Sequence, residues 1–447
     1  GNPEKLGVTR AGRELNFAVA VQDGKDCSLL LYRKGMDEPE LELGFTDDMR
    51  FGEICAMGLE GLPVQEYEYN YKIDRKVVQD PYAAFIRGRE IWGKAVEEEK
   101  FRCQTRFESF SWAGDHPLAL PVEQCVLYKT HVRGFTMDPS SGVRHPGTFA
   151  GIREKIPYLK KLGITQLLLM PVYEFAEIRE EHAAKKHMPV RKGMGERINY
   201  WGYGPSFLYA LKTSYGSGEI EPEREFKELV KALHRENMEC ILEFYFTGKE
   251  SPGDVLHVLR YWLQEYHVDG FRLTGFAPRE AIAGDPFLRC TKLFADSWEE
   301  ALERRPKTGY PMPGDGKVTL RDKHLAEYNG RFEEDMRRLL KGDEGMLNSL
   351  AFHSRRNPAE YGIINYMANT NGMTMMDMVS YDRKHNEDNH EDNRDGTDHN
   401  YSWNCGEEGP TRKRRIRDLR RQQLCNGFLL LFLSQGTPLL LAGDEFG

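Results

Sequence analysis

The sequence predicts an α/β protein in which a (β/α)8 TIM barrel follows an N-terminal immunoglobulin-like β-sandwich. Three observations lead to this fold class. The chain has 447 residues, more than a single hydrophobic core usually supports. Its first part carries short runs in which polar and apolar residues alternate, whereas later runs are continuously apolar and are separated by amphipathic stretches. Continuous apolar runs indicate strands that are covered on both faces, as in a parallel sheet.

The N-terminal part carries the pattern of a small sandwich. Alternating runs lie at 15–21, 27–35 and 67–73, and Gly, Asp and Pro residues separate them. Between about 88 and 118 the sequence becomes charged and irregular, which indicates a domain boundary. We therefore expect a β-sandwich domain at 1–118 and a barrel domain at 119–447.

The second part alternates strands with helices. The predicted strands lie at 125–132, 165–172, 239–246, 268–274, 292–298, 363–369 and 438–445. Helices are predicted at 148–163, 223–237 and 255–267, where apolar residues recur three or four positions apart. Seven strands, with an eighth expected between 300 and 355, favour a closed barrel, whose chemistry lies at the C-terminal ends of the strands.

Composition narrows the classes of partner. The chain has 62 basic and 70 acidic residues and a net charge of −8, so nucleic acid and membrane are poor partners.

The eight cysteines of the chain form no CxxC pair, which favours reduced, buried thiols over disulfides or zinc. The apolar run 427–443 is interpreted as a buried helix end followed by a core strand. No charged and then apolar leader opens the chain, so we expect a cytoplasmic protein. We also expect no cofactor and no metal.

One biased stretch, 383–396, is rich in Asn, Asp, Glu and His. Apolar and aromatic residues flank it, so we expect a long ordered loop. Calcium ligation is an alternative, although the acidic residues follow no regular ligand spacing.

Several long phrases resemble one enzyme family. They are YKTHVRGFTMDPSSGV (128–143), GTFAGIREKIPYLKKLGITQLLLMPVYEF (147–175), NYWGYGPSFLYA (199–210), HVDGFR (267–272), AEYNGRFEEDMRRLLKGD (326–343), VSYDRKHNEDNHEDNRDGTDHNYSWNCGEEGPT (379–411) and QGTPLLLAGDEFG (435–447). The chain resembles the isoamylase, pullulanase and glycogen-debranching group of glycoside hydrolase family 13. The resemblance implies a catalytic barrel, preceded by a β-sandwich similar to a carbohydrate-binding module.

The resemblance also implies which positions carry the catalytic carboxyl groups. In the retaining mechanism, two carboxyl groups about 5 Å apart act as nucleophile and acid/base. The nucleophile position holds Thr274 here, and the acid/base position holds Asp296, a shorter carboxyl than the usual Glu. The third carboxylate, which stabilises the transition state, belongs to a His-Asp pair, where this chain has Thr370 and Asn371.

A fourth motif reads EFYFTG (243–248), and the long loop that usually follows it is mostly absent. We expect Glu243 to pair with Arg272, because an Arg in a barrel mouth needs a counter-charge, and Arg272 could hold either Glu243 or Asp296. Thr274 lies on the same strand face as Arg272 and has no adjacent base to activate it. Loss of a nucleophile typically costs on the order of 10⁴ to 10⁶ in rate, so ordinary turnover is not expected.

Sugar binding is a separate matter from catalysis. Tyr203 matches the family tyrosine that lies against a sugar ring, and an aromatic face suits the C–H surface of glucose. Trp201 is a further substrate-binding candidate, and core packing is the competing interpretation, which fits Trp201 and Tyr200 better than it fits Tyr203. Tyr401 and Trp403 could contact sugar or pin a loop. His131 and Arg133 are expected to be structural.

Three hypotheses follow. The first is a catalytically inactive protein that binds α-glucan (glycogen, starch or malto-oligosaccharide) and possibly an active glycogen-metabolising enzyme. The second is an active α-1,6-glucan hydrolase that uses Asp296 as acid and Glu243 as nucleophile. The third is a structural subunit of a hetero-oligomer. The chain stops at AGDEFG, which we interpret as a barrel cut short at its C-terminal end.

Overall fold

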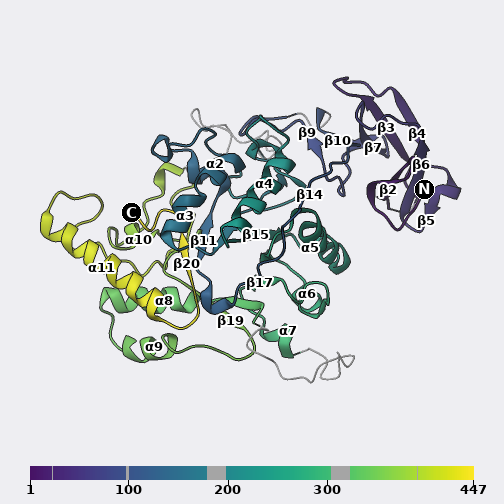
Figure 1. Ribbon diagram of the computed structural model, residues 1–447. Coiled ribbons are helices and arrows are strands. Elements are labelled where there is room, and N and C mark those ends of the chain that lie inside the picture. Colours follow the sequence, from purple (N-terminus) through teal and green to yellow (C-terminus); the bar gives the residue numbers. More distant parts are fainter. Residues whose placement is uncertain (23, 97–99, 179–197, 304–322, 390) are drawn as a thin grey trace. The chain divides into compact units, whose positions relative to one another are not determined.

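The computed structural model describes residues 1–447 apart from 23, 97–99, 179–197, 304–322 and 390 (Figure 1). The described residues group into two compact units. Unit 1 comprises Gly1–Gly114, Pro139–Ile152 and Pro171–Leu229, and unit 2 comprises Asp115–Asp138, Arg153–Met170 and Val230–Gly447. The boundary that we expect between residues 118 and 119 stays a prediction.

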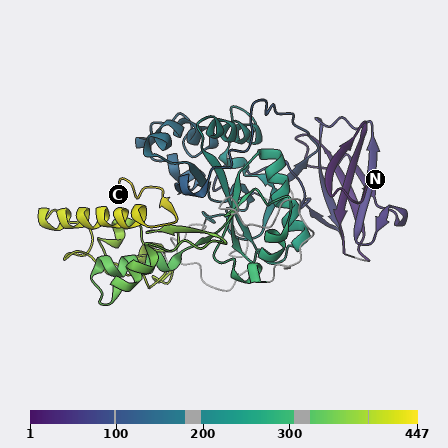
Figure 2. The ribbon, with the colours of Figure 1, turned by 60° about the horizontal axis from the view of Figure 1, so that its bottom comes forward.

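Two antiparallel sheets form the N-terminal part of unit 1, drawn in purple in Figure 2. One has the order β1-β2-β6-β5 and the other β4-β3-β7-β10-β9, with β8 paired to β7. Alternate residues of both sheets share one core, in which the rings of Phe17 and Tyr69 meet edge to face at 5.2 Å. The predicted sandwich strands correspond to β2, β3 and β7. The strands are β1 (Gly7–Ala11), β2 (Glu14–Ala20), β3 (Cys27–Arg33), β4 (Leu41–Gly44), β5 (Arg50–Phe51), β6 (Ile54–Glu60), β7 (Tyr67–Ile73), β8 (Lys76–Val78), β9 (Ile86–Arg87) and β10 (Arg102–Gln104).

Part of the stretch expected to be irregular belongs to this sandwich. Within 88–118, β10 pairs antiparallel with β7. A hairpin of β13 (Tyr173–Phe175) and β14 (Ser206–Leu211) also packs here, since Ala210 lies in the sandwich core and the Phe207 ring is 5.3 Å from that of Phe101. The sequence did not reveal β10, because a strand of three residues does not stand out from its charged surroundings.

Eight parallel strands of unit 2 form a closed barrel, which confirms the predicted fold. All seven predicted strands are present within a few residues of their predicted limits, and the expected eighth is β18. The strands are β11 (Leu127–Thr130), β12 (Gln166–Leu169), β15 (Glu239–Phe246), β16 (Gly270–Gly275), β17 (Lys292–Ala295), β18 (Leu325–Tyr328), β19 (Gly362–Tyr366) and β20 (Thr437–Leu441). Side chains at alternate positions fill the interior, among them Leu127, Leu168, Ile241, Phe294 and Ile364.

Helices connect successive strands, as the amphipathic stretches predict. They are α2 (Phe149–Glu154), α3 (Ile156–Leu162), α4 (Pro222–Arg235), α5 (Pro252–Tyr266), α6 (Arg279–Gly284), α7 (Glu299–Glu303), α8 (Gly330–Lys341), α9 (Met346–His353) and α11 (Arg414–Leu433). The single helix predicted at 148–163 is wrong, because the chain forms two helices there. Pro157 lacks an N–H and fits only the first turn of a helix, so α3 starts anew just before it.

The end of α11 is less buried than the apolar run predicts. Gly427 and Leu431 are buried one turn apart, and α11 lies beside α8 in Figures 1 and 2. Leu429 and Leu433, however, are 56% and 79% exposed. A helix presents only one stripe of side chains to its neighbour, so Leu429 and Leu433, which lie outside that stripe, face outward.

The cysteines follow the prediction in part. All eight are free thiols, and most are buried, but Cys290 and Cys425 are exposed. Among the helices of the described residues, none is long and apolar enough to cross a membrane.

The described residues of the stretch 383–396, all except 390, lie within a long loop, as expected. Arg420 of α11 is buried and donates hydrogen bonds to the carbonyls of Gly409 and Asn404 at 2.8 and 3.1 Å. Glu408 accepts from the backbone N–H of Asp382 at 2.8 Å and bonds His385. Burial raises the pKa of Glu408, but these hydrogen bonds lower it more, so the pKa falls to about 2. The loop is therefore fixed by its own polar contacts.

Candidate active site

The C-terminal half of β16 carries the central residues of the site. Arg272 and Thr274 lie two positions apart and so face the same side, the barrel interior. In the register with β15, Arg272 is next to Glu243 and Thr274 is next to Tyr245. The alternation expected from the sequence therefore holds.

Arg272 forms an ion pair with Asp296, the residue that directly follows β17. The Arg272 side chain is 7% exposed and that of Asp296 is 77% exposed, so the pair reaches from the barrel interior to solvent. The guanidinium also lies 3.8 Å from the ring centroid of Tyr328. Burial lowers the pKa of Arg272, but Tyr328, Asp296 and Glu243 together raise it above its ordinary value. Arg272 therefore stays a cation and holds Asp296 in place.

Glu243 pairs with a residue that the sequence analysis did not single out. Its carboxylate lies 2.8 Å from Nζ of Lys129 on β11, and both side chains are almost completely buried. The predicted Glu243–Arg272 ion pair is therefore wrong: Glu243 acts on Arg272 only at longer range. Lys129 reaches Glu243 because both project into the narrow interior of a closed barrel. The available signal was a lysine inside an otherwise buried strand, YKTH.

Thr274 is engaged with the backbone. Its hydroxyl donates a 3.0 Å hydrogen bond to the carbonyl of Phe244 on the neighbouring strand. A hydroxyl held in this way points its proton at an acceptor that cannot take it, and the oxygen gains no general base.

Thr370 and Asn371 lie in the turn that follows β19, at the same end of the barrel as Thr274. The backbone N–H of Thr370 donates to the side chain of Asn369 at 2.8 Å. Asn371 is exposed, and its carbonyl accepts from the N–H of Thr397. Asn371, which the resemblance places at the position of the third carboxylate, is thus a neutral amide at the surface.

Tyr203 and Trp201 belong to unit 1. The carbonyl of Tyr203 accepts a 3.3 Å hydrogen bond from Asn199, whose side chain also binds the N–H of Gly202. Trp201 is 39% exposed and meets the Tyr200 ring edge to face at 5.1 Å. Tyr200 in turn packs against Trp92 at 6.1 Å. Trp201 is therefore more accessible than core packing predicts, whereas Tyr200 is part of an aromatic cluster.

Three further candidates make contacts with neighbouring parts of unit 2. His131 is buried, and its Nδ1 accepts from the N–H of Gly134 at the start of the short helix α1 (Val132–Thr136). The backbone N–H of Trp403 donates to the carbonyl of Met378 at 2.9 Å, and Arg338 lies 5.9 Å from the Tyr401 ring. Within the described part of the chain, no three His, Cys, Asp or Glu side chains are placed so that they could hold a metal ion.

Comparison with known proteins gives a consistent family signal. Residues 129–248 match the model of the α-amylase catalytic domain. The glycogen debranching enzyme of Serratia proteamaculans is 33% identical over 542 positions, covering 99% of this chain and 77% of that protein. Isoamylase 3, chloroplastic, of Oryza sativa subsp. japonica is 30% identical over 549 positions, covering 100% and 68%. The alignments are longer than this chain, so these relatives contain insertions that it lacks.

Solved structures share the fold. The catalytic module of the glycogen-degrading pneumococcal virulence factor SpuA, in complex with an inhibitor, superimposes with a TM-score of 0.71 at 20% identity, covering 99% of this chain and 70% of that one. Pullulanase type I from Bacillus subtilis, complexed with maltose, gives a TM-score of 0.68 at 19% identity and coverages of 99% and 66%.

Proposed function

The chain belongs to glycoside hydrolase family 13, among the relatives of isoamylases and glycogen debranching enzymes, and from this premise we propose that it binds α-glucan without hydrolysing it. The observation that carries the proposal is Thr274. It stands where the resemblance places the nucleophile, and its hydroxyl is bonded to a backbone carbonyl instead of a general base.

The neighbouring carboxyl groups do not replace the nucleophile. Glu243 is fully buried and paired with Lys129, so a sugar would have to displace a buried ion pair to reach it. Asp296 is accessible, but its carboxylate is held by Arg272. A retaining mechanism needs two free carboxyl groups on either side of the bond, and one accessible carboxylate does not meet that need.

Binding relies on other features. Trp201 is exposed, and the main-chain carbonyl of the partly buried Tyr203 accepts a hydrogen bond from Asn199. Aromatic faces at the surface suit the C–H faces of glucose rings. The structures of maltose-bound pullulanase and of the glycogen-degrading module resemble this chain in fold. A role of the N-terminal sheets as a carbohydrate-binding module, a cytoplasmic location and a partner among active glycogen enzymes complete the proposal.

Hydrolysis of α-1,6 linkages is the second candidate. The specific observation in its favour is the 33% identity to a protein named glycogen debranching enzyme. This candidate requires Asp296 to act as acid and another residue to act as nucleophile. It predicts release of linear chains from glycogen, and loss of that release in Asp296→Ala.

One experiment separates the two functions. The purified chain is titrated with glycogen and with maltohexaose, and the same samples are assayed for new reducing ends. Binding that weakens in Tyr203→Ala, with no new reducing ends, supports the proposal. Tyr361→Ala is the matched control, because it also removes a tyrosine ring. Tyr361 precedes β19, at the N-terminal end of the barrel and away from the candidate site, so this variant should bind as the unaltered chain does. New reducing ends that disappear in Asp296→Ala would overturn the inactive assignment.

A further inference from the structure

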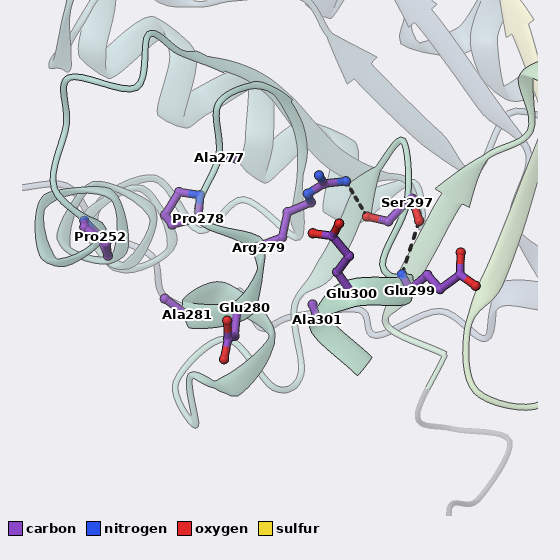
Figure 3. A pocket seen from close by; sticks show the side chains of 10 residues that line it. All are labelled: Pro252, Ala277, Pro278, Arg279, Glu280, Ala281, Ser297, Glu299, Glu300 and Ala301. Carbon is purple, nitrogen blue, oxygen red and sulfur yellow. Dashed lines mark hydrogen bonds between the residues drawn. The ribbon is translucent and has the colours of Figure 1, made fainter. Parts of the chain in front are cut away.

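A pocket at the mouth of the barrel is part of the candidate active site. Figure 3 shows its lining, in which Arg279, after β16, donates a 2.7 Å hydrogen bond to the carbonyl of Ser297, after β17. Ser297 directly follows Asp296, so the pocket and the Arg272–Asp296 ion pair share one turn of the chain. A different chemistry is present in the sandwich of unit 1.

Two cysteines of this sandwich face each other from different sheets. Cys27 is the first residue of β3 and Cys55 is the second residue of β6, and both side chains lie in the core that the two sheets share (Figure 1). Both are free thiols, 4% and 0% exposed. The thiol of Cys27 donates a hydrogen bond to the sulfur of Cys55. The two sulfur atoms are therefore neighbours inside one core.

A cation lies beside the pair. Arg50 of β5 is directly opposite Cys55 in the antiparallel register, so both side chains leave the sheet on the same face. Its guanidinium donates a 2.6 Å hydrogen bond to the carbonyl of Lys25, two residues before Cys27. Arg50 thus reaches from the strand of Cys55 to the segment that leads into Cys27. A nearby cation favours the thiolate, which is the reactive form of cysteine.

The two thiols differ in how readily they ionise. Burial raises the pKa of Cys55, whereas Arg50 and the hydrogen bond from Cys27 lower it. Burial and the charge of Cys55 raise the pKa of Cys27 to about 12, although Arg50 lowers it. Cys55 therefore ionises first and is the better nucleophile of the two. Cys27 is held next to it as the thiol that can close a bridge.

The pair lies close to solvent along the chain. Asp26, next to Cys27, and Glu53, two residues before Cys55, are exposed. The strand β5 has two residues and forms the edge of its sheet. Few hydrogen bonds hold such a strand, so it opens at a lower free-energy cost than the central strands. A small uncharged oxidant can therefore reach Cys55 when β5 opens, without unfolding of the whole sandwich.

We propose that Cys27 and Cys55 form an intramolecular disulfide when the chain meets hydrogen peroxide. The thiolate of Cys55 attacks one oxygen of the peroxide, the O–O bond breaks, and a sulfenic acid forms on Cys55. The thiolate of Cys27 then attacks the sulfur of the sulfenic acid, so that the S–S bond forms and the S–O bond breaks. Each step releases hydroxide, which takes the proton that one thiol gave up. Two thiols are oxidised, and one peroxide is reduced to two waters.

This oxidation site goes beyond the proposed function, because neither cysteine takes part in binding glucan. The bridge joins the two sheets covalently and closes the chain between residues 27 and 55. Such a loop restricts the unfolded chain, so the oxidised sandwich should resist unfolding better than the reduced one.

The test starts from a chain with Cys290→Ser and Cys425→Ser, which removes the two exposed thiols and leaves six of the eight cysteines. The folded protein is treated with hydrogen peroxide, unfolded in urea, alkylated with N-ethylmaleimide and analysed by mass spectrometry. We expect the alkylated thiols to fall from six to four per chain. Trypsin cleaves between Cys27 and Cys55, after Arg33, so a pair of peptides joined through these two residues identifies the bridge. Dithiothreitol should restore all six thiols.

Matched variants show whether the bridge is specific. Cys27→Ala and Cys55→Ala should each abolish it, whereas Cys103→Ala, which removes another buried thiol of the same core, should leave it intact. Arg50→Gln should slow the loss of thiols about two- to tenfold, because the cation that favours the thiolate is gone.

Three results would overturn the inference. They are retention of all six thiols after peroxide, oxidation of Cys55 to a sulfinic acid without joined peptides, and a bridge from either residue to another cysteine. The decisive peptides come from a chain in which Cys27 and Cys55 are unaltered. Poor folding of an alanine variant therefore leaves the test valid.

Discussion

The two ends of the barrel interior carry similar charged residues in opposite environments. At the N-terminal end, Glu239 opens β15 and Lys292 opens β17, and both are buried. Glu239 bonds Lys292, the side chain of Gln166 at 2.6 Å and the N–H of Leu120 at 2.8 Å. Lys292 also donates to the carbonyl of Leu120 at 2.7 Å. These contacts link buried side chains to one another and to the backbone.

The C-terminal end is only partly closed. The Lys129–Glu243 pair is buried there, but the Arg272–Asp296 pair has one member in solvent. Removal of one partner of a buried ion pair is strongly destabilising, because it leaves the other charge buried and uncompensated. An ion pair open to solvent can exchange its contacts for those of a ligand. Charge at the N-terminal end is therefore enclosed by the fold, whereas part of the charge at the C-terminal end faces solvent.

The largest expected effect tests the closed end. Lys292→Met leaves the Glu239 carboxylate buried without its cation, and removal of one partner of a buried pair costs about 3–5 kcal/mol. Urea unfolding measures the loss. Lys72→Met is the matched control, because its pair with Glu42 is solvent-exposed and should change the free energy of unfolding by less than about 1 kcal/mol. Equal losses in the two variants would break the comparison.

A pH-dependent effect at the same end is expected to be of the next size. His234 lies between Asp115 at 2.7 Å and Asp269 at 2.9 Å. Burial lowers the pKa of His234, but the two carboxylates raise it more, so the pKa rises from 6.5 to about 9. A raised pKa stabilises the fold in full below about pH 6.5, and this contribution is lost as pH rises through about 9. We expect a loss of up to about 3 kcal/mol, measured by urea unfolding from pH 6.5 to 10. Should His234→Gln keep the same slope, another group is responsible.

A smaller effect is expected at the C-terminal end. Thr274→Val keeps the shape of the side chain and leaves the carbonyl of Phe244 without its donor. The free energy of unfolding should fall by about 0.5–1.5 kcal/mol, the worth of one hydrogen bond. Glycogen affinity should be unchanged, since the hydroxyl is already engaged. A large fall in affinity would mean that Thr274 contacts the glucan.

The smallest effect on stability is expected for Asp296→Asn. The side chain is 77% exposed, so its ion pair with Arg272 should contribute no more than about 1 kcal/mol. Unfolding in urea measures it, with Asp296→Ala as a second variant. A loss comparable to that of Lys292→Met would show that the C-terminal end is as closed as the N-terminal end.

The fold could be predicted largely because hydrophobic patterns are local. Continuous apolar runs marked the barrel strands, and alternation placed Arg272 and Thr274 on one face. The break at Pro157 could have been predicted from the chemistry of proline. The exposure of Leu433 could not, because an apolar helix end has the same sequence pattern whether or not another element covers it.

The candidate site could be predicted only in its residue types. From the family resemblance, the sequence predicts that Thr274 and Asn371 stand at the positions of the nucleophile and the third carboxylate, and it determines that the connection after β15 is short. Only the tertiary structure decided that Glu243 pairs with Lys129 and that Arg272 holds Asp296. The physical reason is closure of the barrel. Strands distant in sequence point their side chains into one narrow interior, where reach and burial choose each partner.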